Sequence, residues 1–176
     1  MILRDGVLAG TAVVVAGTGE LGAAVRERAA ALGAAVAERA VDPWGEEAAF
    51  DGAADVLVYD GAAVAGEGVQ AVLDGAWLTV RPVATAAMIE HGGGLVVLLA
   101  PRLRGAVEEA ARAGLENLAR TLSVEWARFG VRPVAILPGD ATSPAEVAEL
   151  VAFLASPAGA YYSGCALTLG AVEPGA

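Results

Sequence analysis

The chain has 176 residues, and its 11 basic residues, all of them arginine, stand against 21 acidic ones, for a formal net charge of −10. With no lysine, one histidine and one cysteine, the sequence excludes a P-loop lysine, a Schiff-base lysine, a zinc site of histidine and cysteine, and an internal disulfide. The acidic balance also argues against a nucleic acid or an anionic membrane as partner, because either would need a basic patch.

One compact domain over residues 1–176 is expected, because the length and the 56% share of hydrophobic residues suffice for one core. The chain contains 42 alanines and 23 glycines but only 5% aromatic residues, which is typical of closely packed α/β structure. Two uncharged stretches, 6–19 and 150–172, are long enough to suggest a signal peptide and a membrane helix. Glycines and turn residues interrupt both, so we expect buried strands and turns in a cytoplasmic protein.

The first predicted elements are a strand, a glycine-rich turn and a helix. Thr11–Ala16 is a short apolar run rich in β-branched residues, typical of a parallel strand covered on both faces. The turn Gly17–Gly22 follows directly. Ala23–Leu32 then reads as a helix that ends at Gly33, because glycine is common just after a helix.

Strands and helices alternate along the rest of the chain, and Val41–Ala54 alone reads as irregular. The further predicted elements are, in order, the strands Ala34–Glu38 and Asp55–Tyr59, helical sequence over Gly68–Glu90 on both sides of Pro82, the strand Leu95–Ala100, the helix Glu108–Phe129, the strand Arg132–Leu137, the helix Pro144–Ala155 and the strand Cys165–Leu169. This alternation predicts an α/β fold with a doubly wound parallel sheet, Rossmann-like and shortened to about six strands.

The glycine turn has the spacing Gly-x-Gly-x-x-Gly of a dinucleotide site. Its first glycine allows the tight turn, the second lets the backbone approach a pyrophosphate, and the third packs the helix on the strand. The helix that follows offers unpaired N–H groups to an anion. The turn residues predicted to bind a cofactor are Gly17, Thr18, Gly19, Leu21 and Gly22.

Two residues at the end of the second predicted strand bear on the identity of that cofactor. Glu38 lies 21 residues after Gly17, where an acidic residue binds the ribose 2′-hydroxyl of NAD. The adjacent Arg39 would instead favour the 2′-phosphate of NADP. The sequence therefore leaves both NAD and NADP open, together with the alternative that this strand-turn-helix unit is inherited and no longer binds a nucleotide.

The second half of the chain carries a family resemblance. The segments that carry it are Ala110–Leu122 with Val124–Trp126, Gly130–Gly139, and Glu146–Ser156 with Tyr162–Gly164. They resemble the active-site helix, the next strand with its Pro-Gly turn, and the C-terminal region of the short-chain dehydrogenase/reductase family. The resemblance begins at Asp55 and covers most of the chain; it is most specific over 108–169 and weaker at the N-terminus, and it implies an NAD(P)-dependent oxidoreductase fold. The family's Asn-Asn-Ala-Gly turn falls on Tyr59–Ala62, which adds Asp60 and Gly61 to the cofactor-binding residues that the resemblance implies.

The catalytic set of that family is missing from this chain. Its Tyr-x-x-x-Lys motif falls on Glu108 and Arg112, its serine on Ala100 or Pro101, and its proton-relay asparagine on Ala76. An ionised glutamate cannot donate a proton to a forming alkoxide, and a nearby arginine keeps a glutamate ionised. We therefore expect no catalytic residue here, and we interpret Glu108 and Arg112 as a solvated ion pair one helical turn apart.

Two segments are also shorter than the resemblance implies. Between Glu38 and Asp55 there is too little chain for the family's usual helix and third strand, which would line the adenine pocket. Between Gly139 and Pro144 the segment that covers the substrate in that family is reduced to four residues. Without this lid and the catalytic set, the chain is not expected to be a self-sufficient reductase.

The leading hypothesis is a catalytically inactive subunit that assembles with an active short-chain dehydrogenase paralogue and supports its structure. By analogy with the family, such a complex would belong to hydroxyacyl-CoA or steroid metabolism. The resemblance implies two interfaces, one through helix 108–129 and one through the C-terminal helix and strand 144–169, and a homo-oligomer through the same surfaces stays open. The other hypotheses are an NAD(P)-dependent oxidoreductase that uses a displaced group such as Tyr59, and a nucleotide-binding module without a partner enzyme.

Overall fold

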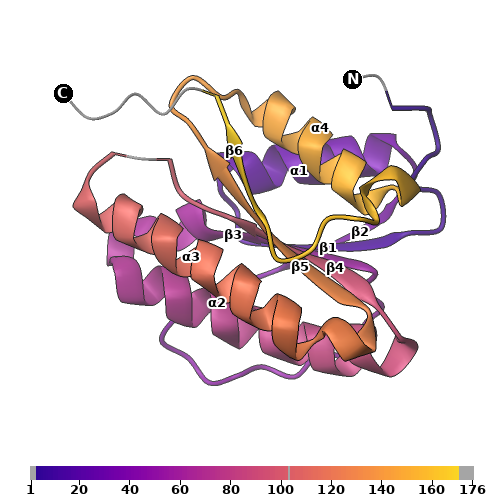
Figure 1. The fold of residues 1–176 in the computed structure, drawn as a ribbon, viewed down its shortest axis with the longest axis horizontal. Helices are drawn as coiled ribbons and strands as arrows, with labels where there is room; N and C mark the ends of the chain where they lie inside the picture. The colour runs from indigo at the N-terminus through magenta and orange to yellow at the C-terminus, as the bar shows by residue number, and fades with distance from the viewer. Residues whose placement is uncertain (1–2, 103, 171–176) are drawn as a thin grey trace.

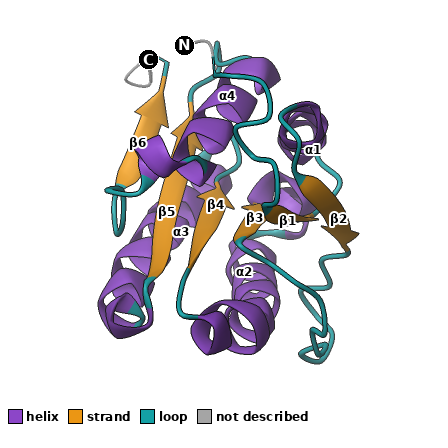
Figure 2. Ribbon diagram, turned by 90° about the vertical axis from the view of Figure 1, so that its right-hand side faces the viewer, coloured by secondary structure: helices purple, strands orange, loops and turns teal. Residues whose placement is uncertain are grey.

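The structure, a computed structural model, describes residues 3–102 and 104–170, and these form a parallel sheet with helices on both faces (Figures 1 and 2). Six strands lie in the order β2-β1-β3-β4-β5-β6, and every neighbouring pair is parallel. The strands are β1 (Ala12–Ala16), β2 (Ala35–Arg39), β3 (Val56–Asp60), β4 (Gly94–Leu99), β5 (Val131–Pro138) and β6 (Ala166–Leu169). The predicted doubly wound, Rossmann-like sheet is confirmed.

Four main helices connect the strands and cover the sheet in two pairs. They are α1 (Glu20–Ala31), α2 (Val69–Val83), α3 (Ala106–Glu125) and α4 (Pro144–Ala155). Figure 1 shows α1 and α4 on one face of the sheet and α2 and α3 on the other. Short 3-10 segments at Gly61–Glu67, Ala127–Phe129 and Pro157–Gly159 follow β3, α3 and α4.

The strand side chains divide between two hydrophobic cores, because successive residues of a strand point to opposite faces. In β1, Val13 and Val15 pack with α1 and α4, whereas Val14 packs with α2 and α3. Strands β3 and β4 alternate in the same way and are almost fully buried. A continuous apolar run in the sequence therefore serves both faces of the sheet at once.

Two helices have boundaries that differ from the sequence expectation. Helix α1 begins at Glu20, inside the glycine turn, because Gly19 acts as its N-cap residue. The helical sequence predicted over Gly68–Glu90, on both sides of Pro82, is confirmed, as α2 contains Pro82 and a π-helical turn over Ala84–Ile89 follows it. The predicted helix 108–129 ends at Glu125 and closes with the 3-10 turn after Trp126.

The irregular segment between β2 and β3 packs against α2. Gly75 of α2 makes room for it, since a Cβ atom at Gly75 would lie 3.0 Å from Val41 and 3.5 Å from Pro43. Figure 2 shows this loop leaving β2 and returning to β3 on the side of the sheet that α2 covers. As the short segment led us to expect, the described chain between β2 and β3 forms a loop rather than a further helix and strand.

No described helix is both long enough and apolar enough to cross a membrane. The uncharged stretch 150–172 is, up to residue 170, the end of α4, a turn and β6, as predicted.

Candidate functional site

The topology brings the predicted cofactor residues together at the carboxyl ends of β1 and β3. The chain turns from β1 toward the β2 edge, whereas β3 lies on the other side of β1, so the strand order switches direction between these two strands. In open α/β sheets such a switch point forms the ligand-binding crevice. Gly17 follows β1 with a φ of +98°, a conformation suited to glycine, and its N–H donates to the carbonyl of Arg39 at 3.1 Å.

The carboxylate of Asp60 fills the inside of the glycine turn. Asp60 ends β3 and is fully buried; one carboxylate oxygen accepts a hydrogen bond from the N–H of Gly22 at 2.9 Å, and the other from the N–H of Ala62 at 3.1 Å. A Cβ atom at Gly22 would lie 3.0 Å from that carboxylate, and one at Gly19 would overlap it. Burial raises the pKa of Asp60, and the two backbone N–H groups partly offset the rise.

The other turn residues take up different positions. Thr18 is exposed, Leu21 is buried in the core between α1 and the sheet, and Gly61 is buried beneath β4, where a Cβ atom would lie 2.9 Å from the carbonyl oxygen of Leu99. The geometry thus explains the presence of glycine at positions 19 and 22 in a way that the sequence alone did not. A side chain at Gly19 would overlap the Asp60 carboxylate, and one at Gly22 would press closely on it.

The two residues expected to recognise the ribose are engaged with the chain itself. Glu38 forms an exposed ion pair with Arg26 of α1. The guanidinium of Arg39 donates to the carbonyl of Ala48 at 2.7 Å and lies 5.7 Å from the ring centroid of Phe50. Both residues therefore tie β2 to its neighbours, α1 in one case and the loop before β3 in the other.

The interpretation of Glu108 and Arg112 as a solvated ion pair is wrong. Arg112 is only 8% exposed, and its guanidinium donates to the carbonyl of Pro101 at 2.9 Å and to that of Pro138 at 2.8 Å. These carbonyls lie at the ends of β4 and β5, where the chain leaves the sheet, and the face of α3 that carries Arg112 packs on them. Burial lowers the pKa of Arg112, and the charge of Asp140 opposes this shift.

Glu108 lies apart from Arg112, at the mouth of the crevice. It lines a small pocket of about 200 Å³ between the start of α1 and the start of α3. The charged residues of this pocket are Glu20, Arg102, Arg104 and Glu108.

Apolar side chains stand at the remaining two catalytic positions. Ala100 and Ala76 are both fully buried, and the backbone N–H of Ala100 donates to the carbonyl of Ile136 at 2.9 Å. Arg102, which sequence reasoning missed, donates to the carbonyl of Gly139 at 2.8 Å. The sequence could have pointed to Arg102, because it lies just after the predicted strand Leu95–Ala100, where site residues of α/β sheets gather. Together with Arg112 it joins the ends of β4 and β5.

Tyr59 is not available as a displaced acid. Its side chain is fully buried under α2, and its hydroxyl donates to the carbonyl of Val72 at 2.8 Å. Burial, followed by the charge of Asp60, raises its pKa. The side chain points away from the crevice because Tyr59 and Asp60 are neighbours in a strand and face opposite sides of the sheet.

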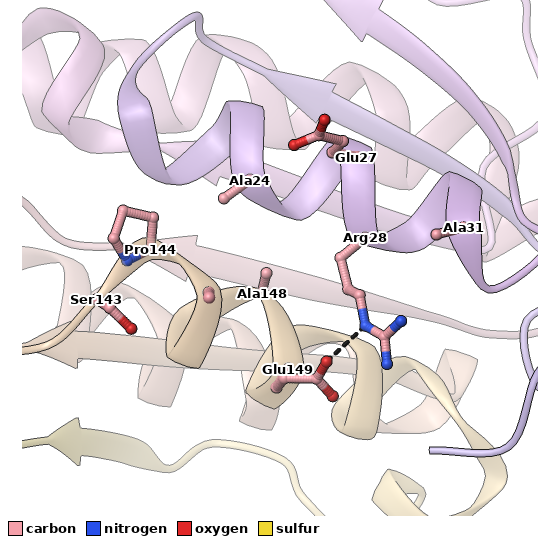
Figure 3. Close-up of a pocket in the computed structure, with 9 residues that line it drawn as sticks. Ala24, Glu27, Arg28, Ala31, Ser143, Pro144, Ala148 and Glu149 are labelled. Carbon is pink, nitrogen blue, oxygen red and sulfur yellow. Dashed lines mark ion pairs between the residues drawn. The ribbon is translucent and has the colours of Figure 1, made fainter. Parts of the chain in front are cut away.

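A second cavity, of about 550 Å³, lies between α1 and α4, away from the crevice (Figure 3). Ala24 and Ala31 of α1 and Ala148 of α4 line it. An ion pair between Arg28 and Glu149, 2.6 Å apart, spans the two helices beside it. Ser143 at the start of α4 also lines it, and the hydroxyl of Ser143 donates to the carboxylate of Glu146 at 2.9 Å, within the cap of that helix.

No protein-family model matches the chain. Its fold is nevertheless shared with solved structures of Rossmann-like proteins. A hydroxysteroid dehydrogenase from Escherichia coli is 18% identical with a TM-score of 0.78, over 94% of this chain and 98% of that chain. A ribose-5-phosphate isomerase from Brucella melitensis 16M is 23% identical with a TM-score of 0.79, over 94% and 93%. BdcA (YjgI) from E. coli is 22% identical with a TM-score of 0.74, over 93% and 100%. At these identities the likeness defines an α/β fold of the Rossmann kind, common to proteins with different names.

Proposed function

We propose that this chain is a catalytically inactive subunit of the short-chain dehydrogenase/reductase type, which assembles with an active paralogue and supports its structure. One observation carries the proposal. Arg112 stands at the position of the family's catalytic lysine, and its guanidinium donates hydrogen bonds to the carbonyls of Pro101 and Pro138. A side chain that bonds two strand ends cannot also hold a nicotinamide ribose.

The fold likeness to a hydroxysteroid dehydrogenase supports the enzyme type of the partner. By analogy, the complex would act on hydroxyacyl-CoA or steroid substrates. The active paralogue would supply the tyrosine, the lysine and the serine, together with the bound NAD or NADP.

Exposed apolar side chains support the two interfaces implied by the resemblance. Val124 of α3 is 79% exposed, and Val107 and Trp77 are exposed on α3 and the adjacent α2. After α4, Tyr161 is 94% exposed, with Tyr162 beside it. Large aromatic residues at a surface are common anchors of protein interfaces. A second copy of this chain would use the same side chains, so a homo-oligomer is the alternative assembly.

Co-expression with a full-length short-chain dehydrogenase that has an intact Tyr-x-x-x-Lys motif and is encoded by a neighbouring gene tests the proposal. Size-exclusion chromatography followed by mass spectrometry is expected to find both chains in one peak, in a fixed ratio. Val124→Glu should weaken or abolish the shared peak, because it places a charge in the interface. Ala30→Glu on α1 is the matched control, since Ala30 is exposed on a helix outside both interfaces. Elution of the two wild-type chains as separate species would overturn the proposal.

A further inference from the structure

The N-terminus of α1 already holds an anion, and that anion is part of the chain. Asp60 reaches it from the end of β3 and accepts the N–H of Gly22, which is one of the helix's first N–H groups. The second carboxylate oxygen is bonded to Ala62. Because both oxygens accept N–H groups, the site suits an ionised carboxylate better than the amide of the family's asparagine, whose NH₂ group would face one of these donors.

We propose that Asp60 sets the ligand specificity of the glycine turn by excluding dinucleotides. Its carboxylate lies buried beneath the turn, at the positive end of the α1 dipole that the pyrophosphate of NAD or NADP would otherwise exploit. Although Arg102 and Arg104 line the same crevice, the buried charge of Asp60 thus does not fit the cofactor that the Gly-x-Gly-x-x-Gly spacing predicts. Gly19 and Gly22 leave room for the Asp60 carboxylate, and Gly17 adopts a positive φ of +98°.

The exclusion has an electrostatic cause. Asp60 is fully buried, so little water screens its charge from an anion bound at the same helix end. The Gly22 N–H is also no longer free to bond a phosphate oxygen. Repulsion between like charges a few ångströms apart in such a place, together with the lost donor, is expected to weaken pyrophosphate binding roughly a hundredfold.

The far end of the crevice adds to the mismatch. Glu38 is paired with Arg26, and Arg39 is bonded to Ala48, so a ribose or its phosphate would have to displace contacts within the chain. These exposed contacts are weak compared with the buried Asp60 bonds. Asp60 is therefore the residue on which the exclusion mainly depends.

The proposal deepens the proposed function, since it concerns the crevice of the same inactive subunit. It states that the complex carries its dinucleotide in the active partner alone. The exclusion of dinucleotides can be tested without a partner, so this proposal and the proposed subunit function can fail separately.

Calorimetric titration of the purified wild-type chain with NADH and with NADPH is the test. We expect no measurable binding to the wild type. Asp60→Asn and Asp60→Ser remove the charge, and each variant that stays folded is expected to bind NADH at least about a hundredfold more tightly than the wild type. Asp55→Asn is the matched control, because Asp55 precedes the same strand and its carboxylate accepts the backbone N–H of Ala12 at 2.7 Å, at the opposite end of the sheet. It should behave as the wild type.

Circular dichroism establishes which variants are folded. Micromolar binding of either dinucleotide to the wild type would overturn the proposal, as would folded Asp60 variants that gain no affinity. If both variants unfold, the wild-type titration decides alone, since binding refutes the exclusion and its absence supports it. A wild type that binds NADH yet elutes with the dehydrogenase refutes the exclusion and leaves the proposed subunit function intact. A wild type that binds neither dinucleotide and elutes separately from the dehydrogenase supports the exclusion and refutes the proposed subunit function.

Discussion

At the scale of single residues, two positions that resemble functional ones are occupied by side chains that bond the fold together. Arg112 links the ends of β4 and β5, and Asp60 links β3 to the start of α1. Their residue types were visible in the sequence, but their partners were not. An arginine side chain can reach backbone carbonyls far along the chain, and only tertiary packing decides whether it meets those or the carboxylate one helical turn away.

Arg112→Met is expected to lower the free energy of unfolding by about 2 to 4 kcal/mol, because it leaves two buried carbonyls without their donor. Urea denaturation followed by circular dichroism measures this change. Arg120→Met is the control on the same helix, where the ion pair with Glu116 is exposed, and it should change the free energy by less than about 0.5 kcal/mol. Equal losses in the free energy of unfolding for the two substitutions would mean that the buried Arg112 bonds stabilise the fold no more than an exposed ion pair does.

Asp60 makes stability depend on pH in an unusual direction for a carboxylate. Burial raises its pKa in the folded chain above the ordinary value of 3.8. Between the ordinary and the raised pKa the folded state binds more protons than the unfolded state, so the free energy of unfolding falls as the pH rises. Urea unfolding of the wild type relative to Asp60→Asn should show this fall beginning above about pH 4 and levelling off above the raised pKa. A relative stability that increases with pH would show that the two N–H bonds outweigh burial.

At the scale of elements, the sequence predicted the order of strands and helices well because apolar runs and turn residues are local signals. The start of α4 is an example. Ser143 accepts the N–H of Glu146 at 3.2 Å, and the Glu146 carboxylate accepts the N–H of Ser143 at 2.7 Å, just before the proline that the sequence placed at the helix start. The start of α1 was missed because Gly19 caps that helix without a side chain, and glycine alone marks a turn.

Ser143→Ala should destabilise α4 by about 1 kcal/mol, because it removes half of this reciprocal cap. Hydrogen exchange of the first turn of α4 should accelerate more than that of α3. Ser163→Ala, at an exposed position after the helix, serves as the control and is expected to leave both unchanged. If the two variants exchange alike, the cap does not hold the helix start.

At the scale of the whole molecule, the sheet and its two helix layers form a Rossmann-like architecture, and side-chain bonds join the strand ends around its switch point. The architecture followed from the alternation of elements, since a strand-helix-strand repeat has few ways to bury its apolar faces. The bonds around the switch point did not, because those of Asp60, Arg102 and Arg112 span 26 to 38 residues of sequence. Such contacts have no periodicity for a sequence pattern to reveal.

The bond between Gly22 and Asp60 also has a consequence for the order in which the chain folds. It spans 38 residues and joins the first turn of α1 to the last residue of β3. The first turn of α1 therefore gains its bond to Asp60 only once β3 has paired with β1. The segment between them, which contains β2 and its loop, is then closed into a loop between two fixed ends. The first turn of α1 and the end of β3 therefore become stable together. The anion that binds this helix start is the Asp60 carboxylate, which is part of the chain itself.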